Sequence, residues 1–133
     1  MAALLISFCG QSQAANPTLL LFGGKDHDVF LGCLNCSRTD PTSVWNAYGK
    51  YGSEYQSNSI WNRYGTYGSV YNQNSPWNTY SSQGPVIVDP EGNSYGYFTR
   101  NKYHQQTRID WVVWILDHYD EVIEHLDEVR ENF

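Results

Sequence analysis

The amino-acid sequence predicts a small α+β domain: an antiparallel sheet formed by two hairpins, an aromatic repeat region between them, and a C-terminal amphipathic helix. Short apolar runs around turn-forming residues indicate the hairpins, at 18–34 and 85–101. Residues 43–84 repeat a sixteen-residue unit, which indicates that one small structure recurs. Residues 107–133 carry apolar side chains at helical spacing. With 133 residues in total, the chain fits a single domain, which we place at 15–133.

Residues 1–14 have the pattern of a secretory signal peptide. Ala2 to Phe8 is a short apolar segment, and Ser12 and Ala14 are small residues at the −3 and −1 positions of a cleavage site. The basic residues that usually begin such a peptide are missing, since the first is Lys25; a buried N-terminal strand or helix is the alternative. No run approaches the length of apolar sequence that a membrane span needs. We therefore expect an exported protein, periplasmic or secreted.

The first hairpin is predicted from two apolar runs, TLLLF and DVFLGCL, on either side of GGKDHD, a segment rich in turn formers. Asp26, His27 and Asp28 lie at its tip and are weak candidates for a cation site. Asp and Gly are also the residues that turn geometry itself favours. A solvated loop tip is therefore the preferred interpretation, and we assign no metal site.

Two cysteines follow directly, Cys33 and Cys36 in a CxxC motif. An even number of cysteines in an oxidising compartment favours a disulfide, provided that Cys9 is removed with the signal peptide. The motif also occurs in thiol-exchange proteins, usually at a helix N-terminus within a βαβ pattern that is absent here. A zinc site would need two further ligands, of which only His27 is near. Disulfide, redox and metal interpretations all remain open.

The repeat reads SVWNAYGKYGSEYQSN, SIWNRYGTYGSVYNQN and SPWNTYSSQG. Its aromatic residues are spaced as on a helix, but its glycines are unfavourable in a long one. We therefore expect one or two helical turns, capped by Ser43 and closed at Gly49, followed by an extended or looping tail. A unit of this size cannot bury its own rings, so the units must stack on one another or on the sheet.

The aromatic rings of the repeat could form the core or a recognition surface. Aliphatic residues are scarce in this part of the chain, so we expect Trp45, Trp61 and Trp77 to be buried. Rings and amides that stay exposed would suit a protein or a cell-surface glycan as ligand. The candidate binding residues are Tyr51, Tyr55, Tyr67, Tyr71, Asn46, Asn62 and Asn78.

The second hairpin is predicted from PVIV and SYGYFT, which flank the turn sequence DPEGN. Thr107 and Asp110 then have the spacing of a capping box and predict the start of a helix. Its apolar stripe consists of Ile109, Val112, Leu116, Tyr119, Ile123, Leu126 and Phe133.

The formal net charge of −6 is concentrated in the C-terminal segment. From Ile109 onward, eight acidic residues accompany a single basic residue, Arg130. The remainder of the chain is nearly neutral and has no cluster of Lys or Arg. Nucleic acid and anionic membranes are therefore poor partners.

The segments VFLGCLNC (29–36) and PVIVDPEGNSYGYFTRN (85–101), together with the SxWNxYGxYGSxY repeats, resemble a group of small exported bacterial proteins of uncharacterised function. The resemblance covers residues 19–103 and excludes the acidic C-terminal helix. It implies a shared fold and a shared CxxC motif, and it brings no catalytic residues with it.

These observations favour a non-catalytic exported module with a binding or structural role, which acts through its aromatic and Asn-rich repeats on an unknown ligand and needs no cofactor. The sequence has no Ser/His/Asp arrangement, paired-acid motif or phosphate-binding loop of the kind that marks an enzyme. The alternative is a thiol-redox or metal-dependent activity centred on Cys33 and Cys36. The sequence does not indicate an oligomeric state.

Overall fold

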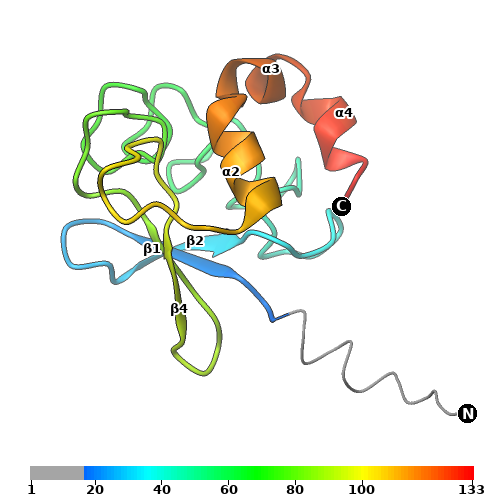
Figure 1. Ribbon diagram of the computed structural model, residues 1–133. Helices are drawn as coiled ribbons and strands as arrows, with labels where there is room; N and C mark the ends of the chain where they lie inside the picture. The colour runs from blue at the N-terminus through cyan, green and yellow to red at the C-terminus, as the bar shows by residue number, and fades with distance from the viewer. Residues whose placement is uncertain (1–16) are drawn as a thin grey trace, which may run out of the picture.

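The structure, a computed structural model, describes residues 17–133 (Figure 1). The expected signal peptide at 1–14 lies outside these residues. Within them, four strands form one antiparallel sheet in the order β2-β1-β3-β4. The strands are β1 (Leu20–Gly23), β2 (Val29–Cys33), β3 (Val86–Val88) and β4 (Ser94–Tyr97). Together with the C-terminal helices, this sheet confirms the predicted α+β fold.

The two hairpins join through their inner strands, β1 and β3. Leu21 of β1 lies opposite Gly32 on one side and Ile87 on the other. The side chains of Leu21, Leu31 and Ile87 are fully buried, because this face of the sheet packs into the core that the repeats and helices complete. In Figure 1 the repeats and the helices lie together above the sheet, while the turn between β3 and β4 projects away from them.

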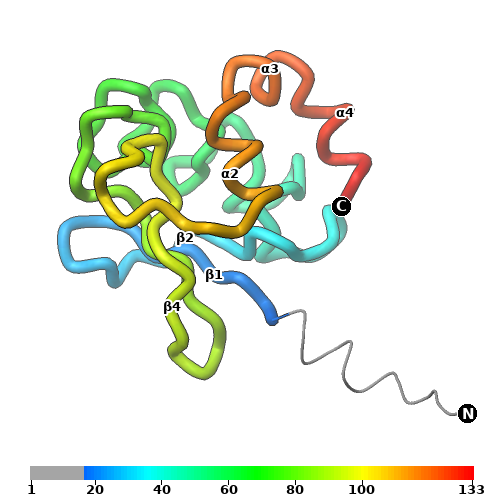
Figure 2. Tube along the Cα trace, in the orientation of Figure 1, coloured from blue at the N-terminus to red at the C-terminus, as the bar shows by residue number. Residues whose placement is uncertain are grey.

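The repeats form a chain of tight turns, so the predicted helical turns are wrong. In the first unit, the backbone oxygens of five residues each accept an N–H three or four residues later; these are Ser43, Asn46, Gly49, Ser53 and Gln56. These five hydrogen bonds span three, three, four, three and three residues, which together make up the sixteen-residue period of the repeat. The second unit repeats the same five bonds from Ser59. Figure 2 shows the result as a series of loops beside α2.

Hydrogen bonds between side chains and backbone explain why the repeat forms turns and not a helix. The Ser43 hydroxyl accepts the N–H of Trp45 at 3.0 Å, and the Asn46 side chain accepts that of Tyr48 at 3.0 Å. Such local bonds offer the backbone an alternative to helical bonding. Gly52 then lies so close to Asn46 that a Cβ at this position would overlap the Asn46 backbone. Serine thus shapes the start of each unit, as expected, but as part of a turn.

The three tryptophans form a buried column, as the composition predicts. Trp45, Trp61 and Trp77 are at most 1% exposed. Adjacent ring centroids are 5.3 and 5.4 Å apart. Phe133 stacks on Trp45 at 4.1 Å, and Tyr119 stacks on Trp77 at 4.3 Å. The C-terminal segment therefore closes both ends of the column.

Within residues 17–133, three short helices replace the single helix expected at 107–133: α2 (Asp110–Asp117), α3 (Tyr119–Glu124) and α4 (Leu126–Arg130). The prediction of one helix was wrong because the backbone departs from helical geometry at His118 (φ −115°, ψ 30°) and at His125 (φ −119°, ψ 34°). The three helices still keep their apolar sides on the core, since Val112, Tyr119 and Leu126 are all buried.

The start of the first helix also differs from the prediction. Thr107 does not cap it, because its hydroxyl accepts the N–H of Ile109 at 3.3 Å and its own N–H donates to the Tyr97 backbone oxygen at 2.9 Å. Thr107 thus belongs to a segment that lies along β4, and α2 begins three residues later, at Asp110.

Candidate binding surface

Six of the eleven tyrosines, all within the described residues, are almost completely exposed. They are Tyr48 (98%), Tyr55 (89%), Tyr64 (98%), Tyr71 (90%), Tyr80 (89%) and Tyr103 (99%). Isolated apolar residues on a surface are ordinary, but a repeated set of large exposed rings is not. We refer to these six residues as the exposed tyrosines.

The exposed tyrosines occupy equivalent places in the turns. Tyr48, Tyr64 and Tyr80 each follow an Asn by two residues, and each donates its backbone N–H to that Asn side chain at 2.9–3.1 Å. Tyr55 and Tyr71 each donate their backbone N–H to the hydroxyl of the serine two residues earlier, at 3.2 Å. In the Asn-x-Tyr turns and in the turns that begin at Ser53 and Ser69, the third residue therefore points its side chain into solvent. In the turns that begin at Ser43, Ser59 and Ser75, by contrast, the third residue is a buried tryptophan.

Tyr103 belongs to a fourth turn of the same kind, which the sequence reasoning missed. Its N–H donates to the Asn101 side chain at 3.0 Å, and the His104 N–H closes the turn on the Asn101 backbone oxygen at 3.1 Å. The Asn101 amide reaches back to the Ser81 oxygen at 2.8 Å and ties this turn to the end of the repeats. The Asn-x-Tyr sequence at 101–103 was the signal available.

The four tyrosines expected to bind fall into two groups. Tyr55 and Tyr71 are exposed. Tyr51 is half-buried and packs edge-on against Phe30, with ring centroids 4.9 Å apart. Tyr67 is half-buried against the core. Tyr48, Tyr64, Tyr80 and Tyr103 were not among the candidates, although they are exposed to the same degree as Tyr55 and Tyr71.

The candidate asparagines hold the turns together. The amide nitrogens of Asn46, Asn62 and Asn78 each donate to a backbone oxygen six residues earlier, at 3.1–3.3 Å. Their side-chain oxygens accept the tyrosine N–H groups described above. Since both ends of each amide are engaged, these side chains contribute mainly to the architecture.

Four adjoining grooves, three between the repeats and α3 or α4 and one within the repeats, together form what we call the repeat–helix surface. Tyr64 and Tyr71 line a groove of about 350 Å³ with Asp120 and Glu124. Tyr55 and Tyr64 line the next, of about 340 Å³. Arg63 borders both of these and a third groove of about 490 Å³. The fourth, of about 670 Å³, contains Tyr48.

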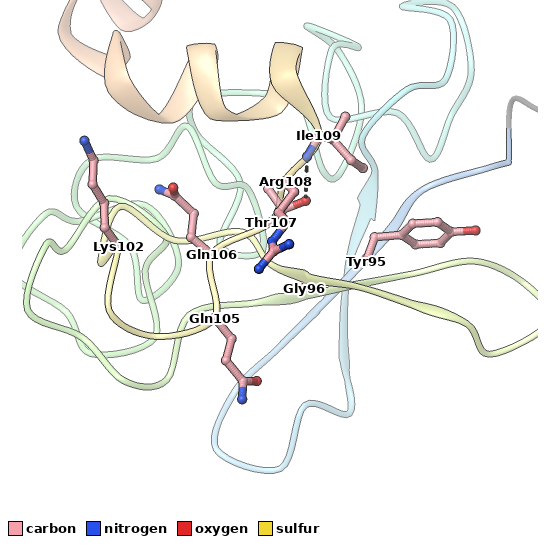
Figure 3. A pocket seen from close by; sticks show the side chains of 8 residues that line it. All are labelled: Tyr95, Gly96, Lys102, Gln105, Gln106, Thr107, Arg108 and Ile109. Atoms are coloured by element: carbon pink, nitrogen blue, oxygen red, sulfur yellow. Dashed lines mark hydrogen bonds between the residues drawn. The ribbon is translucent and has the colours of Figure 1, made fainter.

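A separate, wider groove of about 730 Å³ lies between β4 and residues 102–109. Figure 3 shows that Tyr95, Lys102 and Gln105 point in different directions around it. The Tyr95 hydroxyl is already bonded to Asp89 at 2.7 Å, and the Lys102 ammonium lies 3.9 Å from Asp117. The polar groups thus do not converge on a point where a substrate could react.

Asp89 anchors the turn next to that groove. Its buried carboxylate accepts the side-chain and backbone N–H groups of Asn93, the Tyr95 hydroxyl and the Glu91 N–H. These bonds, the Asn93 side chain first, hold the pKa of Asp89 below its usual range. The same carboxylate raises the pKa of Tyr95. These hydrogen bonds stabilise the turn between β3 and β4.

Cys33 and Cys36 lie at disulfide distance, with Cα atoms 5.5 Å apart. Cys33 is fully buried at the end of β2. The loop they enclose is hydrogen-bonded to the first repeat. The Leu34 oxygen accepts the Trp45 indole N–H at 2.7 Å, and the Cys36 oxygen accepts the Ser43 hydroxyl at 3.0 Å. The disulfide therefore fixes the position of the segment to which the first repeat is hydrogen-bonded.

The candidate cation ligands at 26–28 do not converge. The His27 Nε2 lies 3.1 Å from the Gly84 backbone oxygen, and its ring packs edge-on against Tyr97. Asp26 and Asp28 are exposed. Across residues 17–133 the structure brings together no group of three or more His, Cys, Asp or Glu side chains that could hold a metal ion.

Among residues 17–133, no helix has the length and apolar character needed to cross a membrane. No protein-family model matches the chain, and neither a curated protein nor a solved structure is detectably similar to it.

Proposed function

We propose that this protein is an exported, non-catalytic module that binds a ligand through its exposed tyrosines. One observation carries the proposal: six large rings are 89–99% exposed, and five of them recur at equivalent places in a repeat whose Trp, Asn and Gly residues serve the fold.

The fold gives no reason for tyrosine at these positions. Tyr48 and Tyr64 contribute a backbone N–H to the turn, which any residue except proline would supply. Trp61, by contrast, fills the core, and Gly68 avoids a clash with the Asn62 backbone. Tyrosine is a frequent recognition residue because it offers a large, rigid, amphipathic surface at low entropic cost.

Export is supported by the cysteines and by the signal-like pattern at 1–14. A disulfide persists in oxidising compartments and is rare in reducing ones. The Cys33–Cys36 pair encloses the segment that is hydrogen-bonded to the first repeat, so a bond that such a compartment maintains would fix the local geometry there. The resemblance to small exported bacterial proteins agrees with this location.

The alternative activity at the CxxC motif has less support. Thiol exchange requires an accessible sulfur with a depressed pKa, commonly at a helix N-terminus. Cys33 is fully buried at the end of a strand, Cys36 is half-buried, and neither lies at a helix N-terminus. The loop between them is hydrogen-bonded to the first repeat. A structural disulfide accounts for this arrangement.

The test is an array of defined oligosaccharides and of short neutral, acidic and basic peptides, probed with the disulfide-intact protein. We expect the protein to bind at least one class of these ligands. Changing Tyr48, Tyr64 and Tyr80 together to Ser should weaken that binding at least about tenfold, which corresponds to the loss of two or three ring contacts. Trp114→Phe, at a half-exposed position on α2, is the control. Retention that is unchanged in the triple variant, or no retention by the wild type, would contradict the proposal.

A further inference from the structure

We propose that the repeat–helix surface binds a cationic peptide segment, with Lys or Arg side chains placed against its tyrosine rings and acidic side chains. The inference rests on the proposed function and specifies the chemistry of the ligand.

The first step is that exposed tyrosines and helix acids line the same grooves. Tyr64 and Tyr71 share a groove with Asp120 and Glu124. Tyr55 shares one with Glu54, and Tyr48 shares one with Asp127 and Glu131, beside the C-terminal end of α4. Each ring on this surface thus has a carboxylate in its own groove.

The second step is the charge balance of that surface. Six acidic residues line its four grooves: Glu54, Asp120, Glu124, Asp127, Glu128 and Glu131. The basic groups are Arg38, Arg63 and Arg130, with His125 beside Glu128 at 3.3 Å. Arg130 is buried and bonded to Asp127 and to the Gly52 oxygen. The exposed charge is therefore predominantly negative.

The third step compares ligand classes. A cation over a tyrosine face is attracted by the ring, and a nearby carboxylate adds to that attraction. The molecule contains such pairs itself, since Lys50 lies over the Tyr51 ring at 5.7 Å and Arg100 over Tyr119 at 5.9 Å. A neutral glycan would use hydrogen-bonding groups but not the net negative charge of the grooves, and the side-chain amides of Asn46 and Asn62 are already engaged in the turns. An anionic ligand would be repelled.

The experiment measures binding of a fluorescent Arg- and Lys-rich peptide to the disulfide-intact protein. A Gln-substituted peptide, a Glu-substituted peptide and a neutral oligosaccharide are the comparison probes. We expect the basic peptide to bind at least about tenfold more tightly than the others and to weaken strongly as ionic strength rises from about 0.02 M to about 0.3 M.

Two sets of variants separate specific recognition from general attraction to an acidic protein. Asp120→Asn with Glu124→Gln, and separately Tyr64→Ser with Tyr71→Ser, should each weaken basic-peptide binding by about fivefold or more. Glu91→Gln also removes a carboxylate charge, but on the remote β3–β4 turn, and should leave basic-peptide binding unchanged.

The outcomes are distinguishable. If a neutral oligosaccharide or the Gln peptide binds as tightly as the basic peptide and is lost in the tyrosine variant, the cationic ligand is excluded while the tyrosine-mediated function stands. If neither variant pair affects any probe, both proposals fail at this surface. If Glu91→Gln weakens basic-peptide binding as much as the acidic pair does, the attraction is one of general charge and the inference is overturned, while the tyrosine pair still tests the proposed function. Absence of basic-peptide binding at low ionic strength also overturns the inference.

Discussion

The Trp61 indole N–H donates to the backbone oxygen of Val44 at 2.6 Å, across one full repeat. Trp77 makes the same bond to Ile60, and Trp45 makes it to Leu34 in the disulfide loop. The disulfide loop is thus equivalent to a preceding unit. At the other end, the Pro76 oxygen accepts the Arg100 N–H at 2.8 Å, so the second hairpin closes the series. Each tryptophan both fills the core and fixes the position of its unit.

Replacing Trp61 separates these two roles. Trp61→Ala removes the ring from the column and should cost about 3–5 kcal/mol of unfolding free energy. Trp61→Phe keeps a ring but leaves the buried Val44 oxygen without its donor, which should cost about 1–3 kcal/mol. Urea unfolding measures both. Trp114→Phe on the half-exposed face of α2 serves as control and should change stability by less than about 1 kcal/mol.

Gly68 tests the turn geometry of the repeat. A Cβ at this position would overlap the backbone oxygen of Asn62, and backbone cannot move aside as a flexible side chain can. Gly68→Ala should therefore destabilise the protein by about 3 kcal/mol or more. At Gly65 an added Cβ would meet only the Asn62 side chain, at 3.2 Å, so Gly65→Ala is the matched control. Equal effects of the two changes in thermal unfolding would contradict the close approach.

The sheet and the buried tryptophans could be predicted from the sequence because each follows from a local rule. The runs around Leu21 and Ile87 are apolar and flanked by turn residues, and the middle of the chain offers little else to bury than Trp45, Trp61 and Trp77. The helical turns were predicted wrongly for an equally physical reason. Five turns in sixteen residues give about 3.2 residues per turn, close to the 3.6 of an α-helix, so the aromatic spacing looks helical.

The exposed tyrosines could be predicted only in part. Which rings face solvent depends on the turn of the unit to which each residue belongs, because the third residue is an exposed tyrosine in some turns and a buried tryptophan in others. The turns themselves were not anticipated. Tyr55 and Tyr71 were therefore chosen together with the half-buried Tyr51 and Tyr67, while Tyr48 was passed over. Tyr103 was missed because its turn follows the second hairpin in the sequence and meets the repeats through a long-range bond, from the Asn101 amide to the Ser81 oxygen.

Arg130 should be a major anchor of the C-terminal helices. Its guanidinium is buried and donates to the Gly52 backbone oxygen at 2.6 Å, joining α4 to the first repeat. Arg130→Met keeps the aliphatic stem but leaves that oxygen unpaired, which should cost about 1–3 kcal/mol. Its ion-pair partner Asp127 is 91% exposed, so Asp127→Asn should cost less than about 1 kcal/mol. Urea unfolding of both variants checks this; a larger loss in Asp127→Asn would show that the ion pair is the dominant contact.

Asp89 should make stability depend on pH in the acid range. Because its hydrogen bonds, led by that from Asn93, lower its pKa in the folded state, its contribution is complete above the unfolded-state pKa of about 3.9. That contribution is lost as the pH falls from there through the lower, folded-state pKa. The stability difference between wild type and Asp89→Asn should therefore be constant near neutral pH and shrink below about pH 4. A difference that grew on acidification would contradict this sign.

The central claim is that the exposed tyrosines serve recognition and not folding, and the unfolding free energy of the triple variant Tyr48→Ser, Tyr64→Ser and Tyr80→Ser tests it most directly. Since these side chains are 89–98% exposed, and exposed substitutions usually change stability by at most about 0.5 kcal/mol each, we expect the triple variant to lie within about 1.5 kcal/mol of the wild type in urea unfolding. A loss of more than about 3 kcal/mol would show that the rings stabilise the fold, and would remove the basis for assigning them to a ligand.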